Sequence, residues 1–174
     1  MLKDMLLIEP CCSQKHLRRL RESIGEEGTV LWHGYGDLSF SELLPPLLLN
    51  YSETELMVVA PRLPDQVAEM MAKWMKKQWT KMDGTGSVDV IARLTLVTNL
   101  TEKQSPLAST WLKDNPFGDR LKLRNVQQND TAILLPDLAL YGPINLTYGH
   151  HFTATATKNA RTIAALRETY EGLR

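Results

Sequence analysis

The sequence lacks any apolar run of membrane-spanning length and contains only two cysteines. A spanning helix needs about 20 consecutive apolar residues, and the opening segment, MLKDMLLIEP, is also too short for the apolar region of a secretory leader. Cys11 and Cys12 are adjacent, a spacing that strains an intramolecular disulfide and matches no zinc-binding pattern. We therefore expect a cytoplasmic protein with reduced cysteines and no membrane partner.

The common nucleotide-binding and hydrolase motifs are also absent. The sequence contains no G-x-x-x-x-G-K-[ST], no G-x-G-x-x-G and no G-x-S-x-G. His150 and His151 are neighbours on an expected strand, so their side chains point to opposite faces and do not suit one metal ion. The 20 Lys and Arg balance the 20 Asp and Glu, and this balance excludes an overall field that gathers nucleic acid. We expect no metal and no cofactor.

The apolar pattern of the 174 residues predicts one α/β domain, a mixed β-sheet flanked by helices, over residues 1–174. Residues 1–50 are expected to form an N-terminal helical and loop portion. Asp65 is expected to cap a helix over residues 65–79, whose Met and Trp stripe covers a sheet face. The remaining elements predicted from periodicity are strands at 56–60, 88–98, 121–126 and 151–157, two strands within 129–147, and a final helix that begins at Asn159 or Lys158.

The densest positive cluster lies near the N-terminus. Ser13 can cap a helix over residues 14–24, and the polar face of that helix holds Lys15, Arg18, Arg19 and Arg21. A solvated helix face is the usual meaning of such a run. Contact with phosphate or nucleic acid is the alternative.

Residues 129–147, NDTAILLPDLALYGPINLT, place an Asp between two apolar runs and end the second run on Gly-Pro-Ile-Asn. With the strand and helix that follow, the chain from about residue 56 onward resembles the phospholipase D superfamily, which includes small homodimeric nucleases. The family signature is H-x-K-x-x-x-x-D followed by G-S-x-N. Asp137, Gly142 and Asn145 match its Asp, Gly and Asn. The alternative interpretation is a plain hairpin in which Asn145 caps a turn.

The reactive residues of that family are missing. Asp130 and Ala132 stand where the His and the Lys belong, and Pro143 replaces the Ser. No other register restores them, because residues 34–149 contain no histidine and residues 123–157 contain no lysine. The family chemistry needs His to take up the phosphoryl group, and Lys and Asn to neutralise phosphate oxygens. The resemblance therefore implies a catalytically degenerate, phospholipase D/nuclease-like binding or scaffolding protein.

The resemblance also outlines a vestigial cleft and a homodimer in which two copies of the motif face each other. The residues of this vestigial cleft are Asp130, Ala132, Asp137, Gly142, Asn145 and His150. Because a carboxylate at the position of a basic residue repels phosphate, a protein partner is at least as well supported as a nucleic acid.

Two alternative functions remain from the sequence. One is a phosphodiesterase or nuclease in which Asp130 and Asp137 act with a divalent metal, which requires the two carboxylates to converge. The other is a nucleic-acid-binding module that uses the face from Lys15 to Arg21, with binding that weakens steeply as salt rises.

Overall fold

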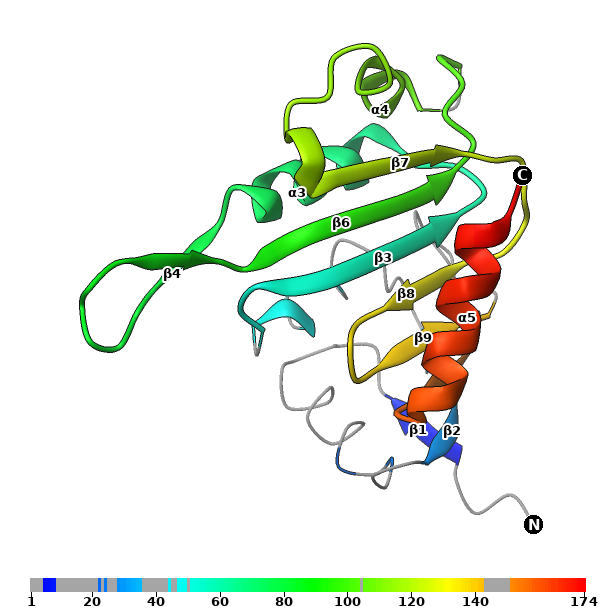
Figure 1. Cartoon of the computed structure of the whole chain (residues 1–174). Helices are drawn as coiled ribbons and strands as arrows, with labels where there is room; N and C mark the ends of the chain where they lie inside the picture. Colours follow the sequence, from blue (N-terminus) through cyan, green and yellow to red (C-terminus); the bar gives the residue numbers. More distant parts are fainter. Residues whose placement is uncertain are drawn as a thin grey trace.

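The described part of the chain builds one mixed, eight-stranded sheet (Figure 1). The computed structural model describes residues 5–8, 22, 24, 28–35, 44, 47–49, 51–103, 105–142 and 151–174. The strands, in their order across the sheet, are β1 (Met5–Ile8), β2 (Thr29–Tyr35), β10 (His151–Thr157), β9 (Ala139–Tyr141), β8 (Ala132–Leu134), β3 (Thr54–Ala60), β6 (Ile91–Thr98) and β7 (Leu121–Asn125). The pairs β1–β2, β3–β6 and β6–β7 are parallel, and the other neighbours are antiparallel.

Helices cover both faces of this sheet. On one face, α3 (Asp65–Met75) lies behind the strands in Figure 1 and the short α4 (Pro106–Thr110) lies above β7, whereas α5 (Ala160–Gly172) crosses the other face. Met71 and Trp74 of α3 pack in one core cluster, and Ile163 and Tyr170 of α5 pack in a second. The α/β prediction, a mixed sheet flanked by helices, is confirmed. None of the described helices has the length and apolar character needed to cross a membrane.

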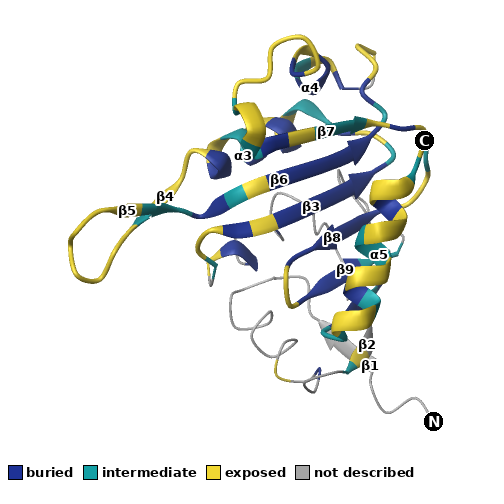
Figure 2. Ribbon diagram, viewed as in Figure 1, coloured by how far each residue is buried: buried dark blue, intermediate teal, exposed yellow. Residues whose placement is uncertain are grey.

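The central strands are buried on both sides, as their continuous apolar runs predict. In β3, Leu56 and Val58 pack in the first cluster, whereas Met57 and Val59 pack in the second. Figure 2 shows the same burial along most of β3, β6, β8 and β9. Most apolar side chains of these strands therefore lie in one of the two core clusters.

Helix α3 is shorter than expected and is capped differently. It ends at Met75, where the N–H groups of Lys76 and Lys77 bond to carbonyls of the last turn, and Gln78–Thr80 turns away as strand β4. Asp65 does not cap the helix. The N-cap is Pro64, which makes no side-chain cap bond, and the Asp65 carboxylate accepts the backbone N–H of Leu107 at 2.8 Å. Asp65 thus ties α3 to α4.

The expectation that residues 1–50 form only helix and loop is wrong. Strands β1 and β2 both belong to the sheet, and β2 pairs with β10 in register from Thr29↔Thr157 to Tyr35↔His151. The pairing gives β10 a second neighbour in place of an unpaired edge. Part of the same segment is also in the first core cluster, namely Ile24, Leu44, Leu47 and Leu48. The helix predicted over residues 14–24 falls mostly outside the described residues.

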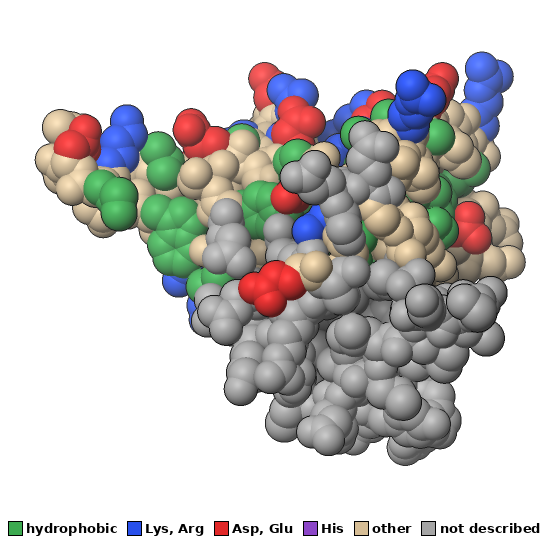
Figure 3. Space-filling model, turned by 90° about the horizontal axis from the view of Figure 1, so that it is seen from below, with side chains coloured by type: hydrophobic (Ala, Val, Ile, Leu, Met, Phe, Trp, Pro, Cys, Tyr) green, Lys and Arg blue, Asp and Glu red, His purple; other side chains and the backbone are tan. Residues whose placement is uncertain are grey.

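A two-stranded arm projects from the body in Figures 1 and 2. It pairs β4 with β5 (Ser87–Asp89), so the single strand expected over residues 88–98 divides at Val90 into β5 and β6. In Figure 3 the arm forms a projection whose surface mixes hydrophobic, acidic and basic side chains. An isolated two-stranded hairpin is marginally stable in water, so contacts at its base must hold it.

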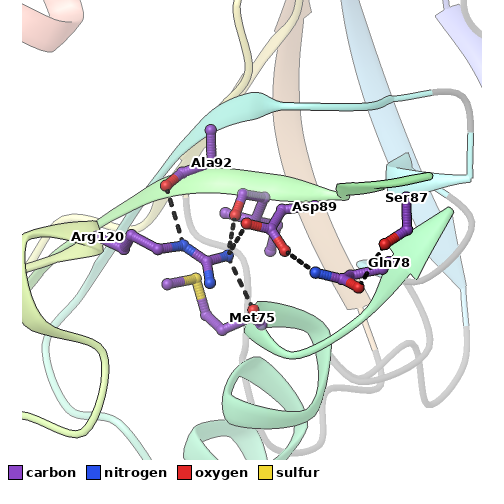
Figure 4. Close-up of polar contacts among 7 residues, drawn as sticks. Met75, Gln78, Ser87, Asp89, Ala92 and Arg120 are labelled. Carbon is purple, nitrogen blue, oxygen red and sulfur yellow. Dashed lines mark hydrogen bonds and ion pairs between the residues drawn. The ribbon is translucent and has the colours of Figure 1, made fainter. Parts of the chain in front are cut away.

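Arg120 provides those contacts (Figure 4). One guanidinium nitrogen donates to the carbonyls of Met75 at 2.9 Å and Ile91 at 2.6 Å, and it lies 3.3 Å from the Asp89 carboxylate. A second nitrogen donates to the Ala92 carbonyl at 3.4 Å. One side chain therefore joins the end of α3, the start of β6 and the base of the arm.

Replacing Arg120 with Met is expected to lower the free energy of unfolding by about 2–4 kcal/mol. Buried carbonyls lose a charged donor, and each unsatisfied buried group costs roughly 1–3 kcal/mol. The matched control is Arg93→Met, because Arg93 makes an exposed 3.6 Å ion pair with Glu55. Such a pair is worth at most about 1 kcal/mol. Urea denaturation measures both variants, and equal losses would contradict the anchoring role of Arg120.

Candidate functional site

The two strands that carry the family-like motif form a tight hairpin in the middle of the sheet. Strand β8 pairs antiparallel with β9, with Ala132 opposite Tyr141. The N–H of Leu135 donates to the Leu138 carbonyl at 2.8 Å and closes the turn, and the N–H of Gly142 donates to the Thr131 carbonyl at 3.1 Å at the open end. Residues just before β8 and just after β9 therefore meet at one end of the hairpin.

This geometry brings some of the predicted site residues together and separates others. Asp130 and Gly142 lie at the open end, whereas Asp137 is exposed in the turn at the opposite end and accepts a hydrogen bond from the Tyr51 hydroxyl. Asp130 and Asp137 thus do not converge, and the metal-assisted alternative loses its geometric basis. In the described residues no group of three or more His, Cys, Asp or Glu is placed to hold a metal ion.

Ala132 occupies a closed position. Its side chain is 0% exposed and lies in the second core cluster with Met57, Ile163 and Tyr170. The cluster places it under α5, so the position that the resemblance assigns to Lys holds a core side chain. Asp130, two residues earlier, is exposed. The position that the resemblance assigns to Lys is therefore buried, whereas the position that it assigns to His is exposed.

A cavity of about 340 Å³ opens beside the hairpin end. Its described lining residues are Asn129, Asp130, Thr131, Tyr141, Gly142 and Tyr170. They come from the segment before β8, the end of β9 and the last turn of α5. None of these lining residues is Lys, Arg or His. The cavity therefore combines one carboxylate with two phenolic side chains and neutral polar groups.

The surroundings of the cavity raise the pKa of Tyr170. Burial raises the pKa of its phenol above the usual 10.0, and the nearby charges of Asp130 and Tyr141 raise it further. The Tyr170 hydroxyl therefore stays neutral at physiological pH. The carboxylate of Asp130 is then the charged group among the described lining residues.

Several predicted site residues lie outside the described part of the chain: Asn145, His150, Lys15, Arg18, Arg19 and Arg21. Sequence reasoning also missed Tyr141 and Tyr170 as cavity residues. Tyr170 does have a sequence signal, its helical spacing from Ile163, but that spacing indicates only a core-facing position. Its proximity to Asp130 arises from how α5 crosses the sheet.

No protein-family model matches this chain, and no curated protein matches it. Among solved structures, the chain is similar to NucT from Helicobacter pylori, with 14% sequence identity, a TM-score of 0.49, and 83% of this chain and 94% of NucT covered. It is also similar to TrmBL2, an archaeal chromatin protein whose structure shows a novel mode of DNA binding. That match has 10% identity, a TM-score of 0.46, and coverage of 81% of this chain and 48% of TrmBL2, so the chain spans about half the length of TrmBL2. At these identities and scores neither likeness assigns a function.

Introducing the His and the Lys that the resemblance assigns to residues 130 and 132 is expected to have unequal effects on stability. Ala132→Lys forces a long charged side chain into a filled core, so the free energy of unfolding should fall by about 3 kcal/mol or more. Asp130→His changes an exposed residue and should alter it by about 0.5 kcal/mol or less. Urea denaturation compares the two single variants. A stable, cooperatively folding Ala132→Lys variant would show that the position is open.

Replacing Asp130 with Asn is expected to lower the pKa of Tyr170, because the phenolate no longer forms beside a negative charge. Carbon-13 NMR of tyrosine Cζ across an alkaline titration measures this pKa, with Tyr170→Phe assigning the signal. Asp137→Asn is the control, since Asp137 lies at the other end of the hairpin. An unchanged Tyr170 pKa in Asp130→Asn would show that the charge of Asp130 does not act on the Tyr170 phenol.

Proposed function

We propose that this protein is a catalytically degenerate phospholipase D-like domain that binds a partner instead of hydrolysing a phosphodiester. The order of elements supports the resemblance. Strand β8, a turn containing Asp137, strand β9, Gly142, strand β10 and helix α5 follow one another as the family pattern implies. Strands β10, β9 and β8 are also consecutive neighbours in the sheet.

The burial of Ala132 carries the non-catalytic part of the proposal. Family-type phosphoryl transfer needs a cation at this position to stabilise the negatively charged transition state. Ala132 has no exposed surface and packs under α5, so neither a side-chain cation nor a phosphate oxygen has room there. The described lining of the adjacent cavity supplies a carboxylate and no cation in compensation.

A protein is the partner that this site supports best. Asp130 opposes a phosphate group at the cavity, whereas a protein surface can offer complementary cationic and neutral groups. The homodimer implied by the resemblance is a further part of the proposal, and nucleic-acid binding through the face from Lys15 to Arg21 is the alternative to it. Sedimentation velocity tests the homodimer. The salt dependence of DNA binding, compared between this chain and its Lys15-to-Arg21 variants, tests the nucleic-acid contact.

The hydrolysis test uses bis-p-nitrophenyl phosphate and labelled single- and double-stranded DNA with the purified chain, with and without Mg²⁺. We expect no hydrolysis above that of an Asp130→Asn preparation purified in parallel, because neither protein has a reactive His and Lys pair. The parallel preparation distinguishes this chain from a contaminating nuclease. Hydrolysis that disappears in Asp130→Asn would refute the proposal.

A phosphate test complements the hydrolysis test. A retained phosphate site with a Kd near 1 mM would add about 2.7 kcal/mol to the free energy of unfolding at 100 mM phosphate. We expect no such gain over a chloride control of equal ionic strength. A gain that Asp130→Asn enlarges would place an anion site at this cavity.

A further inference from the structure

The cavity beside Asp130 has the wrong charge for a phosphate and the right charge for a cation. The side chains that line it, so far as the chain is described, supply one carboxylate, two phenols and neutral polar groups. An anion there would face Asp130 without a described cation nearby. A cation would face a carboxylate whose field already reaches Tyr170.

We propose that this cavity binds the charged end of a lysine or arginine side chain from a protein partner. The inference rests on the proposed function, because it names the group that the degenerate cleft accepts. It reverses the charge of the ligand that the family resemblance implies. Three features of the cavity support it: the carboxylate, the two tyrosines that line it and its position at the end of the hairpin.

The Asp130 carboxylate is available as an acceptor. Its backbone N–H donates to the side-chain oxygen of Gln128, but over the described ranges no hydrogen bond or ion pair reaches the carboxylate itself. An ionised carboxylate offers about four acceptor sites. Ammonium and guanidinium groups donate short, charge-assisted hydrogen bonds to it, and guanidinium does so with two donors at once.

Two tyrosines, Tyr141 and Tyr170, line the cavity. Tyr141 is half-buried and Tyr170 is 6% exposed, so both rings are held by the surrounding core. A cation within about 6 Å of an aromatic ring centre is attracted by the ring quadrupole. Because Tyr170 stays protonated, the described lining holds a single negative charge, which one lysine or arginine side chain neutralises.

The position of the cavity suits a side-chain end presented by a partner. Its volume of about 340 Å³ is at the lower end of the range of about 300–1,000 Å³ for small-molecule pockets. It opens at the end of the β8–β9 hairpin, next to the last turn of α5. A partner can therefore insert a side-chain end there while its own backbone remains outside.

The test is an NMR titration of the ¹⁵N-labelled chain with N-acetyl-lysine methylamide, N-acetyl-arginine methylamide, butylamine and inorganic phosphate. The reporter is the Gly142 amide, which bonds to the Thr131 carbonyl at the cavity. We expect saturable shifts with the two blocked amino acids and none with phosphate. Asp130→Asn should weaken lysine binding about tenfold, the effect of losing one charged hydrogen bond. Asp114→Asn, an exposed acid outside the lining, should leave it unchanged.

Each other outcome overturns the inference in a defined way. Equal lysine binding by the wild type and Asp130→Asn would exclude the carboxylate as the recognition group. Binding of the blocked lysine without any binding of butylamine, which has the same side-chain amine and no backbone, would place recognition on the backbone amides and not on the charged end. Saturable phosphate binding without lysine binding would show that the cavity binds an anion and not a cation. Absent lysine binding in a chain that also fails to hydrolyse phosphodiesters overturns this inference alone, whereas hydrolysis overturns the proposed function.

Discussion

The packing of α5 against the sheet determines the character of the site. The helix begins at a side-chain cap, where the Asn159 carboxamide oxygen accepts the N–H of Thr162 at 2.9 Å. Its far end is fixed by Arg124 of β7, whose guanidinium donates to the Leu173 carbonyl. Between these points, Ile163 and Tyr170 enter the core over β8 and β9. The helix thereby covers Ala132, and its Tyr170 lines the cavity beside Asp130.

Asp130 and Ala132, at the two positions that the proposed resemblance assigns to His and Lys, have opposite environments. The Asp130 side chain lies at the surface and carries a carboxylate. The Ala132 side chain lies in the core, so a long cationic side chain has no space there. A substitution at the exposed residue 130 leaves the core packing in place. A larger side chain at residue 132 requires α5 to repack, because cores tolerate added volume poorly.

Elements with a local apolar or alternating pattern were predicted well from the sequence. The strand at residues 56–60 falls within β3, and the strand over His151–Thr157 matches β10. The stripe of Val67, Met71 and Trp74 is buried as its helical spacing predicts. These elements are defined by periodic burial, which is a local property of the sequence.

Elements that depend on distant partners were predicted poorly. Strand β2 falls within residues 1–50, which were expected to form a helical and loop portion, yet β10 offers it a complementary edge. Helix α3 was extended too far because Gln78 and Trp79 continue its pattern, whereas pairing with β5 makes them a strand. Asp65 fits a helix cap by its type, but the Leu107 amide lies within its reach only in the folded chain. The cavity likewise depends on three separate segments.

The arm also carries an exposed thioether, a group that Met57, Met71 and Met75 bury in the core. Met82 at its tip is fully exposed, whereas Met57, Met71 and Met75 are 0% exposed in the core. Thioether oxidation follows exposure, so mild peroxide would convert Met82 to its sulfoxide before these buried methionines. The tip turn is held locally, by the Asp83 carboxylate accepting from the N–H and hydroxyl of Thr85. A sulfoxide at Met82 would thus mark the arm while leaving the fold intact, and its protection in a complex would reveal whether a partner covers the tip.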